Sequence, residues 1–277
     1  MSMLSPTLHQ SIRRARDIAS EQHGAHATPE HLLLALVDDP DAAPVMRACN
    51  VDTERLRRAI SASLLAGTDD AKPEQATVHP DPRFRSIIRR AVSHIRSVEQ
   101  DEITGAHVLV QMFADPVAGF LREQAVTRYD AAFYVSHGVP SRSVIATSAT
   151  DHMTFAVPAG PDDETYQTRC QVILVNDIYT PMELVIYLLT EIFSITTDDA
   201  TSIMLSTHRD GAGLCGTWSR TEAHSLADRL MTRAREYQHP LRCVTVPFRG
   251  GRAREVFSGW LGWLDRRVWD AFDQRAR

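Results

Sequence analysis

A repeat in the first half of the chain most constrains its fold. The segment Thr28-Pro-Glu-His-Leu-Leu33 returns at a spacing of 76, from Thr28 to Thr104, as Thr104-Gly-Ala-His-Val-Leu109. Asp39-Pro40 returns in the same way as Asp115-Pro116. Each copy joins an N-capping threonine to apolar residues at helical spacing. One copy alone would bury too little apolar surface, so the repeat predicts two four-helix halves packed as one pseudo-two-fold bundle.

Helical periodicity extends across the whole of this first part. Apolar residues recur every three or four positions in residues 8–19, 52–64 and 84–95, whereas residues 67–82 are rich in Gly, Asp and Pro and predict a connection. We therefore expect residues 1–138 to form an all-α domain.

The rest of the chain changes character twice. Residues 139–168 are rich in Pro, Ser, Thr and Asp without a period, which predicts a flexible linker. Residues 169–247 alternate strand and helix patterns in the order βααβαβ, which favours a small antiparallel sheet covered by helices. Residues 248–277 carry Trp and aliphatic side chains on one face of an amphipathic helix.

The expected boundaries in this α/β part follow from its composition. Strands are predicted at 170–175, 213–218 and 241–246, and helices after Thr180-Pro181, Thr197 and Ser219.

The basic residues exclude one large class of function. Of 30 basic side chains, 29 are Arg and one is Lys, at Lys72 in an Ala-Lys-Pro context. A Walker A loop requires Gly-Lys-Ser/Thr, so the sequence holds no such phosphate loop. The net charge of −5 does not favour nucleic acid as a partner. No enzymatic motif is present, and we expect a non-enzymatic protein without a cofactor.

The cysteines and the first residues of the sequence predict the cellular compartment. The four Cys are scattered without a CxxC pair, and three lie in apolar runs, which is typical of buried thiols in a reducing compartment. We expect neither a metal site, nor a signal peptide, nor a membrane span. These features predict a soluble cytoplasmic protein.

Two known families are similar to the two parts of the chain. Residues 5–138 resemble the N-terminal domain of Clp unfoldases of the ClpA kind, through Thr28–Leu36, Ala48–Asp52, Ile88–His94, Thr104–Leu109 and Ser136–Gly138. Residues 169–247 resemble ClpS, the adaptor that delivers N-degron substrates to those unfoldases, through Val172–Glu183, Met204, His208, Cys215-Gly216 and His239–Cys243.

The second resemblance implies a binding site. A free α-amino group is a cation with three donors, and it needs oxygen or neutral imidazole acceptors. The resemblance implies that Asn176, Asp177 and His208 hold this amino group. It also implies an apolar pocket for a bulky first side chain, gated by Met182 and lined by Val185, Met204, Thr207 and Leu241. Taken singly, Asn176 is more often a turn residue, His208 is more often a helix-end histidine, and Met182 and Met204 are core residues.

The sequence also departs from the family pattern. Ile178 stands where the family has a second acid that helps hold the amino group, and Thr207 replaces a branched apolar residue. The two positions that contact the unfoldase N-domain in the family are Thr221 and Leu226 here, so docking at them is expected to be weak.

Two functions follow from the resemblance. The first is an adaptor of Clp-dependent proteolysis that binds bulky hydrophobic N-terminal residues and delivers the substrate to a Clp ATPase supplied by another chain. The alternative is a regulatory decoy that competes for adaptor docking on Clp unfoldases, with weak or lost N-degron binding.

Overall fold

The protein divides into two compact units, Met1–Val135 and Ser136–Arg277. The computed structural model describes residues 3–22, 24–66, 78–98, 100–141 and 169–248. The predicted linker therefore falls almost entirely outside the described residues, and so does the predicted C-terminal helix. No helix in the described ranges combines the length and the apolar character that crossing a membrane would require.

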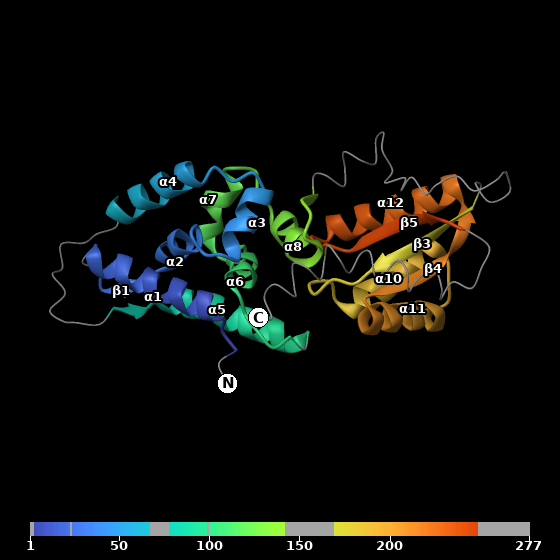
Figure 1. Ribbon diagram of the computed structural model, residues 1–277, viewed down its shortest axis with the longest axis horizontal. Helices are drawn as coiled ribbons and strands as arrows, with labels where there is room; N and C mark the ends of the chain where they lie inside the picture. The colour runs from blue at the N-terminus through green and yellow to red at the C-terminus, as the bar shows by residue number, and fades with distance from the viewer. Residues whose placement is uncertain (1–2, 23, 67–77, 99, 142–168, 249–277) are drawn as a thin grey trace. The chain divides into compact units, whose positions relative to one another are not determined.

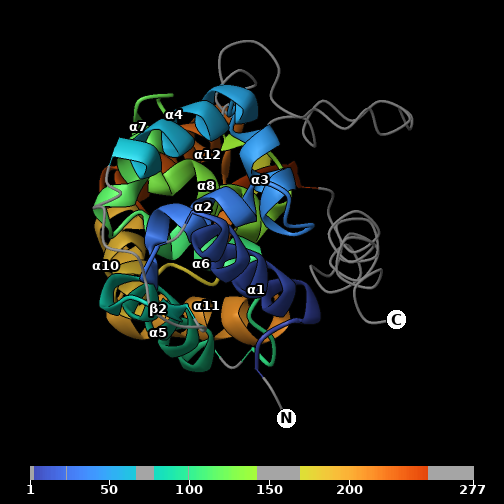
Figure 2. The ribbon, with the colours of Figure 1, turned by 90° about the vertical axis from the view of Figure 1, so that its left-hand side faces the viewer.

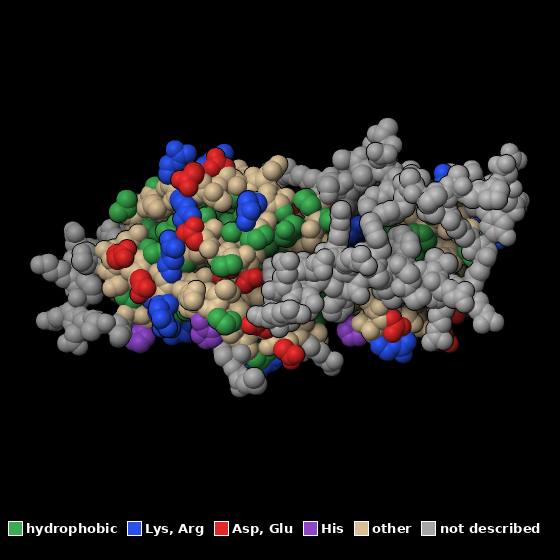
Figure 3. Space-filling model, viewed as in Figure 1, with side chains coloured by type: hydrophobic (Ala, Val, Ile, Leu, Met, Phe, Trp, Pro, Cys, Tyr) green, Lys and Arg blue, Asp and Glu red, His purple; other side chains and the backbone are tan. Residues whose placement is uncertain are grey.

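The first unit is helical, as predicted (Figure 1). Its elements are α1 (Pro6–Glu21), β1 (His26–Ala27), α2 (Pro29–Leu36), α3 (Ala42–Ala48), α4 (Thr53–Ala66), β2 (His79–Pro80), α5 (Pro82–Ser97), α6 (Gly105–Met112), η1 (Pro116–Ala118), α7 (Gly119–Arg122) and α8 (Arg128–His137), the last of which crosses into the second unit. Phe84 and Phe133 are the largest fully buried side chains of its core. On the face seen in Figure 3, basic and acidic side chains lie interspersed over this unit.

Short backbone pairings join the two halves of the repeat crosswise. Ala27 of β1 pairs in parallel with Pro80 of β2, and Leu4 bridges Ile103 in parallel. Leu4 and Pro80 are equivalent positions of the repeat, as are Ala27 and Ile103. Each half therefore supplies one partner to each pairing, which confirms the pseudo-two-fold bundle.

The helix caps repeat as well. Thr28 and His31 form a capping box at the start of α2, and Thr104 and His107 form its equivalent at α6. In both boxes the side chain at the third helical position satisfies a backbone donor that the helix cannot. The repeated signature in the sequence is therefore a repeated cap.

Within residues 169–248, the second unit consists of a three-stranded antiparallel sheet and three helices. Its elements are β3 (Arg169–Val175), α10 (Met182–Phe193), α11 (Thr197–Asp210), β4 (Ala212–Ser219), α12 (Arg220–Glu236) and β5 (Arg242–Pro247). The sheet order is β4-β3-β5, with both pairings antiparallel. The predicted βααβαβ order and antiparallel sheet are confirmed.

The core of this unit lies between one face of the sheet and the helices. Cys170, Val172 and Leu174 alternate along β3 onto that face and share one hydrophobic cluster with side chains from α10, α11 and α12. All four cysteines are free and buried. A hydrogen bond with Cys215, together with burial, raises the pKa of the Cys243 thiol, so this thiol stays protonated.

One helix start differs from the sequence-based expectation by one residue. Helix α10 begins at Met182, directly after Thr180-Pro181 as expected, and its N-cap Pro181 provides no side-chain hydrogen bond. Thr196, not Thr197, caps α11 by accepting a hydrogen bond from the backbone N–H of Asp199. Adjacent threonines are equally good caps by composition, and only the backbone path distinguishes them. Ser219 caps α12 as predicted.

Candidate functional site

Asn176 lies where β3 ends and the chain turns toward α10. Its backbone N–H donates to the carbonyl of Gly211, at a distance of 2.9 Å. Gly211 ends α11 in the left-handed conformation, with φ of +80°, a geometry that favours glycine. His208 is exposed in the last turn of the same helix. The structure thus ties the segment that carries Asn176 to the helix end that carries His208.

Asp177 organises the turn that follows. Its carboxylate accepts hydrogen bonds from the backbone N–H groups of Tyr179 and Thr180, at 2.8 and 2.7 Å, and from the Thr180 hydroxyl at 2.7 Å. The Tyr179 carbonyl in turn lies 2.9 Å from Nδ1 of His239, which immediately precedes Pro240 and Leu241. These bonds make Asp177 a positioning residue for the loop, and its carboxylate is already engaged there.

The predicted pocket residues come from three helices or loops that meet in one place. Val185 of α10, Met204 of α11 and Leu241 before β5 are all buried in the same hydrophobic cluster. Met182, in the first turn of α10, is 40 % exposed. The structure therefore brings three apolar side chains together and leaves at the surface the methionine expected to gate them.

Thr207 is buried but its hydroxyl is satisfied locally. Oγ1 donates to the carbonyl of Ile203, one turn earlier in α11, at 2.8 Å. A Cβ on Gly213 would come within 2.2 Å of this hydroxyl oxygen. The hydroxyl is thus held by the helix against β4. Because the Thr207 hydroxyl bonds within α11, it adds little polarity to the predicted apolar pocket.

The two residues predicted to dock a partner differ in their exposure to solvent. Thr221 is exposed near the start of α12, whereas Leu226 is buried in the core cluster. Leu226 contributes to packing rather than to the exposed face because it lies on the side of α12 that covers the sheet. Docking at Thr221 remains a prediction.

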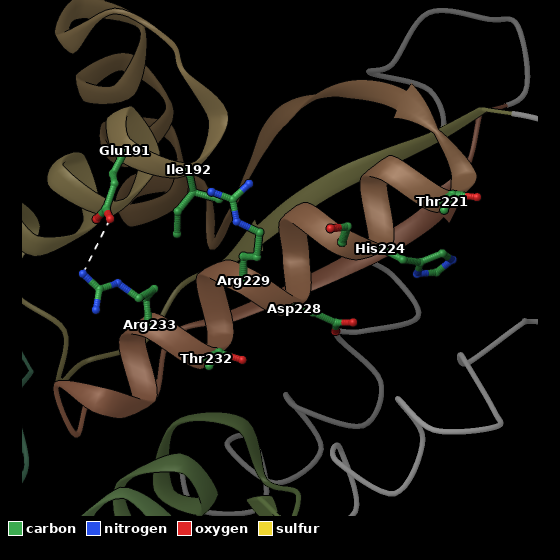
Figure 4. A pocket seen from close by; sticks show the side chains of 9 residues that line it. Glu191, Ile192, Thr221, His224, Asp228, Arg229, Thr232 and Arg233 are labelled. Carbon is green, nitrogen blue, oxygen red and sulfur yellow. Dashed lines mark ion pairs between the residues drawn. The ribbon is translucent and has the colours of Figure 1, made fainter.

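Thr221 lines a shallow groove of about 650 Å³ along α12. Figure 4 shows its polar side chains along α12, with two residues of α10 facing them across the groove. Arg233 ends the groove, 3.5 Å from Glu191 of α10 and 2.6 Å from Glu236, and its guanidinium lies 5.6 Å from the ring centre of Tyr237. Most of the lining residues are therefore polar, and a paired arginine lies at one end of the groove.

Two positioning residues were missed in the sequence. His239 anchors the loop that Asp177 shapes, and Gly213 admits Thr207 against β4. A glycine inside a strand pattern is a signal of close approach and could have indicated the second. Within the described ranges, no group of three or more His, Cys, Asp or Glu side chains could hold a metal ion.

Comparisons with known proteins match the two units separately. The Clp repeat (R) N-terminal domain family matches residues 3–124, and the family of the ATP-dependent Clp protease adaptor protein ClpS matches residues 165–244. A ClpA homolog protein of Fuscovulum blasticum is 43 % identical over 143 residues, which are 49 % of this chain and 18 % of that protein. The chain therefore spans under a fifth of that relative.

The second unit has relatives that it covers more fully. The ATP-dependent Clp protease adapter protein ClpS of Neisseria gonorrhoeae is 46 % identical over 76 residues, 27 % of this chain and 73 % of that protein. Among solved structures, ClpS2 of Agrobacterium tumefaciens bound to L-phenylalaninamide is 29 % identical, with a TM-score of 0.29, and covers 30 % of this chain and 99 % of that one.

Fold and matches together define a protein in which a Clp repeat N-terminal domain precedes an adaptor-type α/β domain. Through that second domain, the chain belongs to the ClpS family of Clp protease adaptors.

Proposed function

We propose that the second unit binds the free α-amino group and bulky hydrophobic first side chain of N-degron substrates. The observation that carries the proposal is the hydrogen bond from Asn176 to Gly211, because it holds the Asn176 segment at the helix end that carries His208. Asn Oδ1 and a neutral imidazole nitrogen are both acceptors that suit an ammonium group. Asp177 belongs to this site chiefly through the turn it shapes.

The apolar part of the site supports the same proposal. Val185, Met204 and Leu241 lie in one cluster, and Met182 is exposed at the start of α10, three residues before Val185. Methionine is flexible and polarisable, so an exposed methionine can move aside and then pack on an aromatic ring. The hydroxyl of Thr207 does not oppose an apolar ligand, since it is bonded to Ile203.

Delivery requires ATP hydrolysis, and the 277 residues contain no Walker A loop. In this proposal, a Clp ATPase supplied by another chain hydrolyses the ATP. Buried free thiols fit a reducing compartment, and we place this activity in the cytoplasm.

Calorimetric titration tests the proposal. A peptide with N-terminal Phe is titrated against the full chain, and its N-acetylated form is the ligand control. We expect binding of the free peptide only, and loss of binding in Asn176→Ala/His208→Ala. His224→Ala is the matched protein control, because it removes a different partly exposed imidazole in the same unit, on α12. Equal affinity for the free and acetylated peptides would refute the proposal.

A regulatory decoy is the second candidate, and the α12 face favours it. Leu226 is buried in the core, so only Thr221 of the predicted docking pair is exposed. A decoy of this kind would bind N-degrons weakly, capture adaptors with its Clp repeat domain, and so restrain turnover instead of promoting it. The two functions differ in the sign of their effect on degradation.

A further inference from the structure

The sheet of the second unit is apolar on both faces. One face packs on α10, α11 and α12, of which α10 and α11 lie side by side in both ribbon views (Figures 1 and 2). Alternation along β3 turns Ile173 to the opposite face, where Leu214 of β4 and Val244 of β5 stand directly beside it in register. We call this the outer face; its apolar cluster consists of Ile173, Ala212, Leu214, Val244 and Val246.

The outer face is buried, although every described member of its cluster belongs to a strand. Val246 lies on β5, an edge strand of the sheet, and is only 4 % exposed. Neighbours within one sheet shield the sides of a side chain and leave its end open, so a further layer must cover Val246. No helix of residues 169–248 supplies that layer, because α10, α11 and α12 all contribute to the cluster on the other face.

Composition distinguishes the two stretches of the second unit that lie outside the described ranges. Residues 142–168 are rich in Pro, Ser, Thr and Asp and have no apolar period. Residues 249–277 instead carry Trp260, Trp263 and Leu264 at the i, i+3 and i, i+4 spacings of one helix face, with Arg and Asp at other positions. A helix of this pattern needs an apolar surface for its Trp face, and the outer face is such a surface.

The chain leaves the sheet next to the outer face. The backbone N–H of Phe248, directly after β5, donates to the carbonyl of Arg169 at 2.9 Å. Gly250-Gly251 follows, and paired glycines allow the chain to reverse its direction. As a helix, residues 253–275 would extend about 35 Å, whereas a strand of seven residues such as β3 extends about 23 Å. The segment is therefore long enough to cross the sheet.

We propose that residues 253–275 form an amphipathic helix that packs its Trp face on the outer face of the sheet. The second unit then has three layers, with helices on both sides of the sheet. The ClpS family match ends at residue 244, so this third layer lies beyond the part shared with that family. Only residues 249–252 separate the helix from Phe248, and so short a connection favours packing within one chain over packing on a second copy.

Fluorine NMR of the full chain labelled with 5-fluorotryptophan tests this packing. The four Trp residues give four signals, which single Trp→Phe substitutions assign. Trp218 is the internal reference, because it packs on the helix side of the sheet, with its ring centre 5.3 Å from that of Phe193. We expect the signals of Trp260 and Trp263 to differ from those of the isolated peptide 249–277, since packing on the sheet changes their surroundings.

A pair of substitutions on β5 assigns the contact to the outer face. Val244→Thr/Val246→Thr makes this face more polar with residues that still suit a strand. We expect the signals of Trp260 and Trp263 to move toward those of the isolated peptide. Thr245→Val is the matched control, because it changes the same strand on the helix side, where the Thr245 hydroxyl lies 3.0 Å from Nδ1 of His224. It should leave both signals in place.

Urea unfolding followed by Trp fluorescence provides a second measurement, since all four Trp residues belong to the second unit. Val244→Thr/Val246→Thr and Trp260→Ala/Trp263→Ala should each lower the urea midpoint. Combined, they should lower it by less than the sum of the two shifts, because both remove the same contact. The shifts of Thr245→Val and Trp260→Ala/Trp263→Ala should instead add.

Three results would overturn the proposal. The first is that Trp260 and Trp263 of the native chain give the signals of the isolated peptide, and the second is that the Val244/Val246 and Trp260/Trp263 changes add. The third is that the signals change on dilution, since a second copy would then cover the outer face. The outer face lies across the sheet from the cluster of Val185, Met204 and Leu241, so these outcomes are independent of N-terminal residue binding.

Discussion

The two repeat histidines, His31 and His107, have a structural role. Nδ1 of each accepts a hydrogen bond from the backbone N–H of the capping threonine, at 3.1 Å in both cases. An accepting Nδ1 places the proton of the neutral ring on Nε2, and in His31 this nitrogen lies 3.2 Å from Oε1 of Gln22. Burial lowers the pKa of His31, against a smaller opposing effect of Glu30. The cap therefore requires a neutral imidazole.

This requirement predicts acid sensitivity of the first unit. The folded-state pKa of His31 lies below its unfolded value of 6.5, and burial lowers the pKa of His94 in the same direction. The unfolded chain then binds more protons below pH 6.5, so the stability present at neutral pH is lost as the pH falls below that value. Urea unfolding followed by far-UV circular dichroism should show a lower free energy of unfolding at pH 5.5 than at pH 7.5. An unchanged or higher value at pH 5.5 would contradict this role of the histidines.

Ile178 is half-buried in the loop after Asn176. A carboxylate there would add a charge-assisted hydrogen bond to a bound ammonium group, worth about 1.5–3 kcal/mol. Ile178→Asp should therefore tighten binding of a peptide with N-terminal Phe by roughly tenfold to a hundredfold. Calorimetry measures this change, and the acetylated peptide should show no gain. Weaker binding of the free peptide would mean that Ile178 contributes apolar contact instead.

Among the helices of the first unit, the start of α6 in one half of the repeat packs closely against a residue of the other half. Gly105, the first residue of α6, lies against the carboxylate of Asp39, and a Cβ there would come within 2.1 Å of Oδ1. Asp39 is buried and accepts hydrogen bonds from the Ser11 hydroxyl and from the backbone N–H groups of Asp41 and Ala42 at the start of α3. It cannot move aside without losing them.

Gly105→Ala should accordingly destabilise the first unit by about 1–3 kcal/mol, the usual cost of overpacking. Gly119 is the matched control, because it is helical and a Cβ there would meet nothing within 4 Å. Gly119→Ala should stabilise the unit by about 0.4–1 kcal/mol. Far-UV circular dichroism during urea unfolding is the suitable probe, since all four Trp residues lie outside this unit. Equal effects of the two substitutions would contradict the packing described for Gly105.

Elements were easier to predict from the sequence than contacts between them. The N-caps Thr28 and Thr104 could be predicted because a threonine before a helical pattern is a local signal, whereas the part of each cap made by His31 and His107 needed the structure. The sheet order β4-β3-β5 depends on pairings between distant strands, and no local pattern encodes it. The same holds for the burial of Leu226 and for the turn held by Asp177, which depend on backbone paths that composition does not determine. The likeness to ClpS named the site residues, and their geometry needed the structure.

At the scale of the whole molecule, the chain joins a Clp repeat domain to a ClpS-type domain. An adaptor should accelerate degradation of an N-degron reporter by a Clp unfoldase and its peptidase, and a decoy should slow it. We expect acceleration by the native chain, with the effect lost in Asn176→Ala/His208→Ala. A reporter with an acetylated N-terminus is the control. Slower degradation with the native chain would favour the decoy.

The proposed adaptor role depends on Asn176 and His208 together binding a free N-terminal amino group. Heteronuclear NMR of the full chain tests it most directly, by comparing amide and imidazole shifts with a peptide starting in Phe and with its acetylated form. We expect the signals of Asn176, His208 and Met182 to shift with the free peptide and to stay in place with the acetylated one. Shifts that are the same for both peptides, or that miss Asn176 and His208, would contradict it.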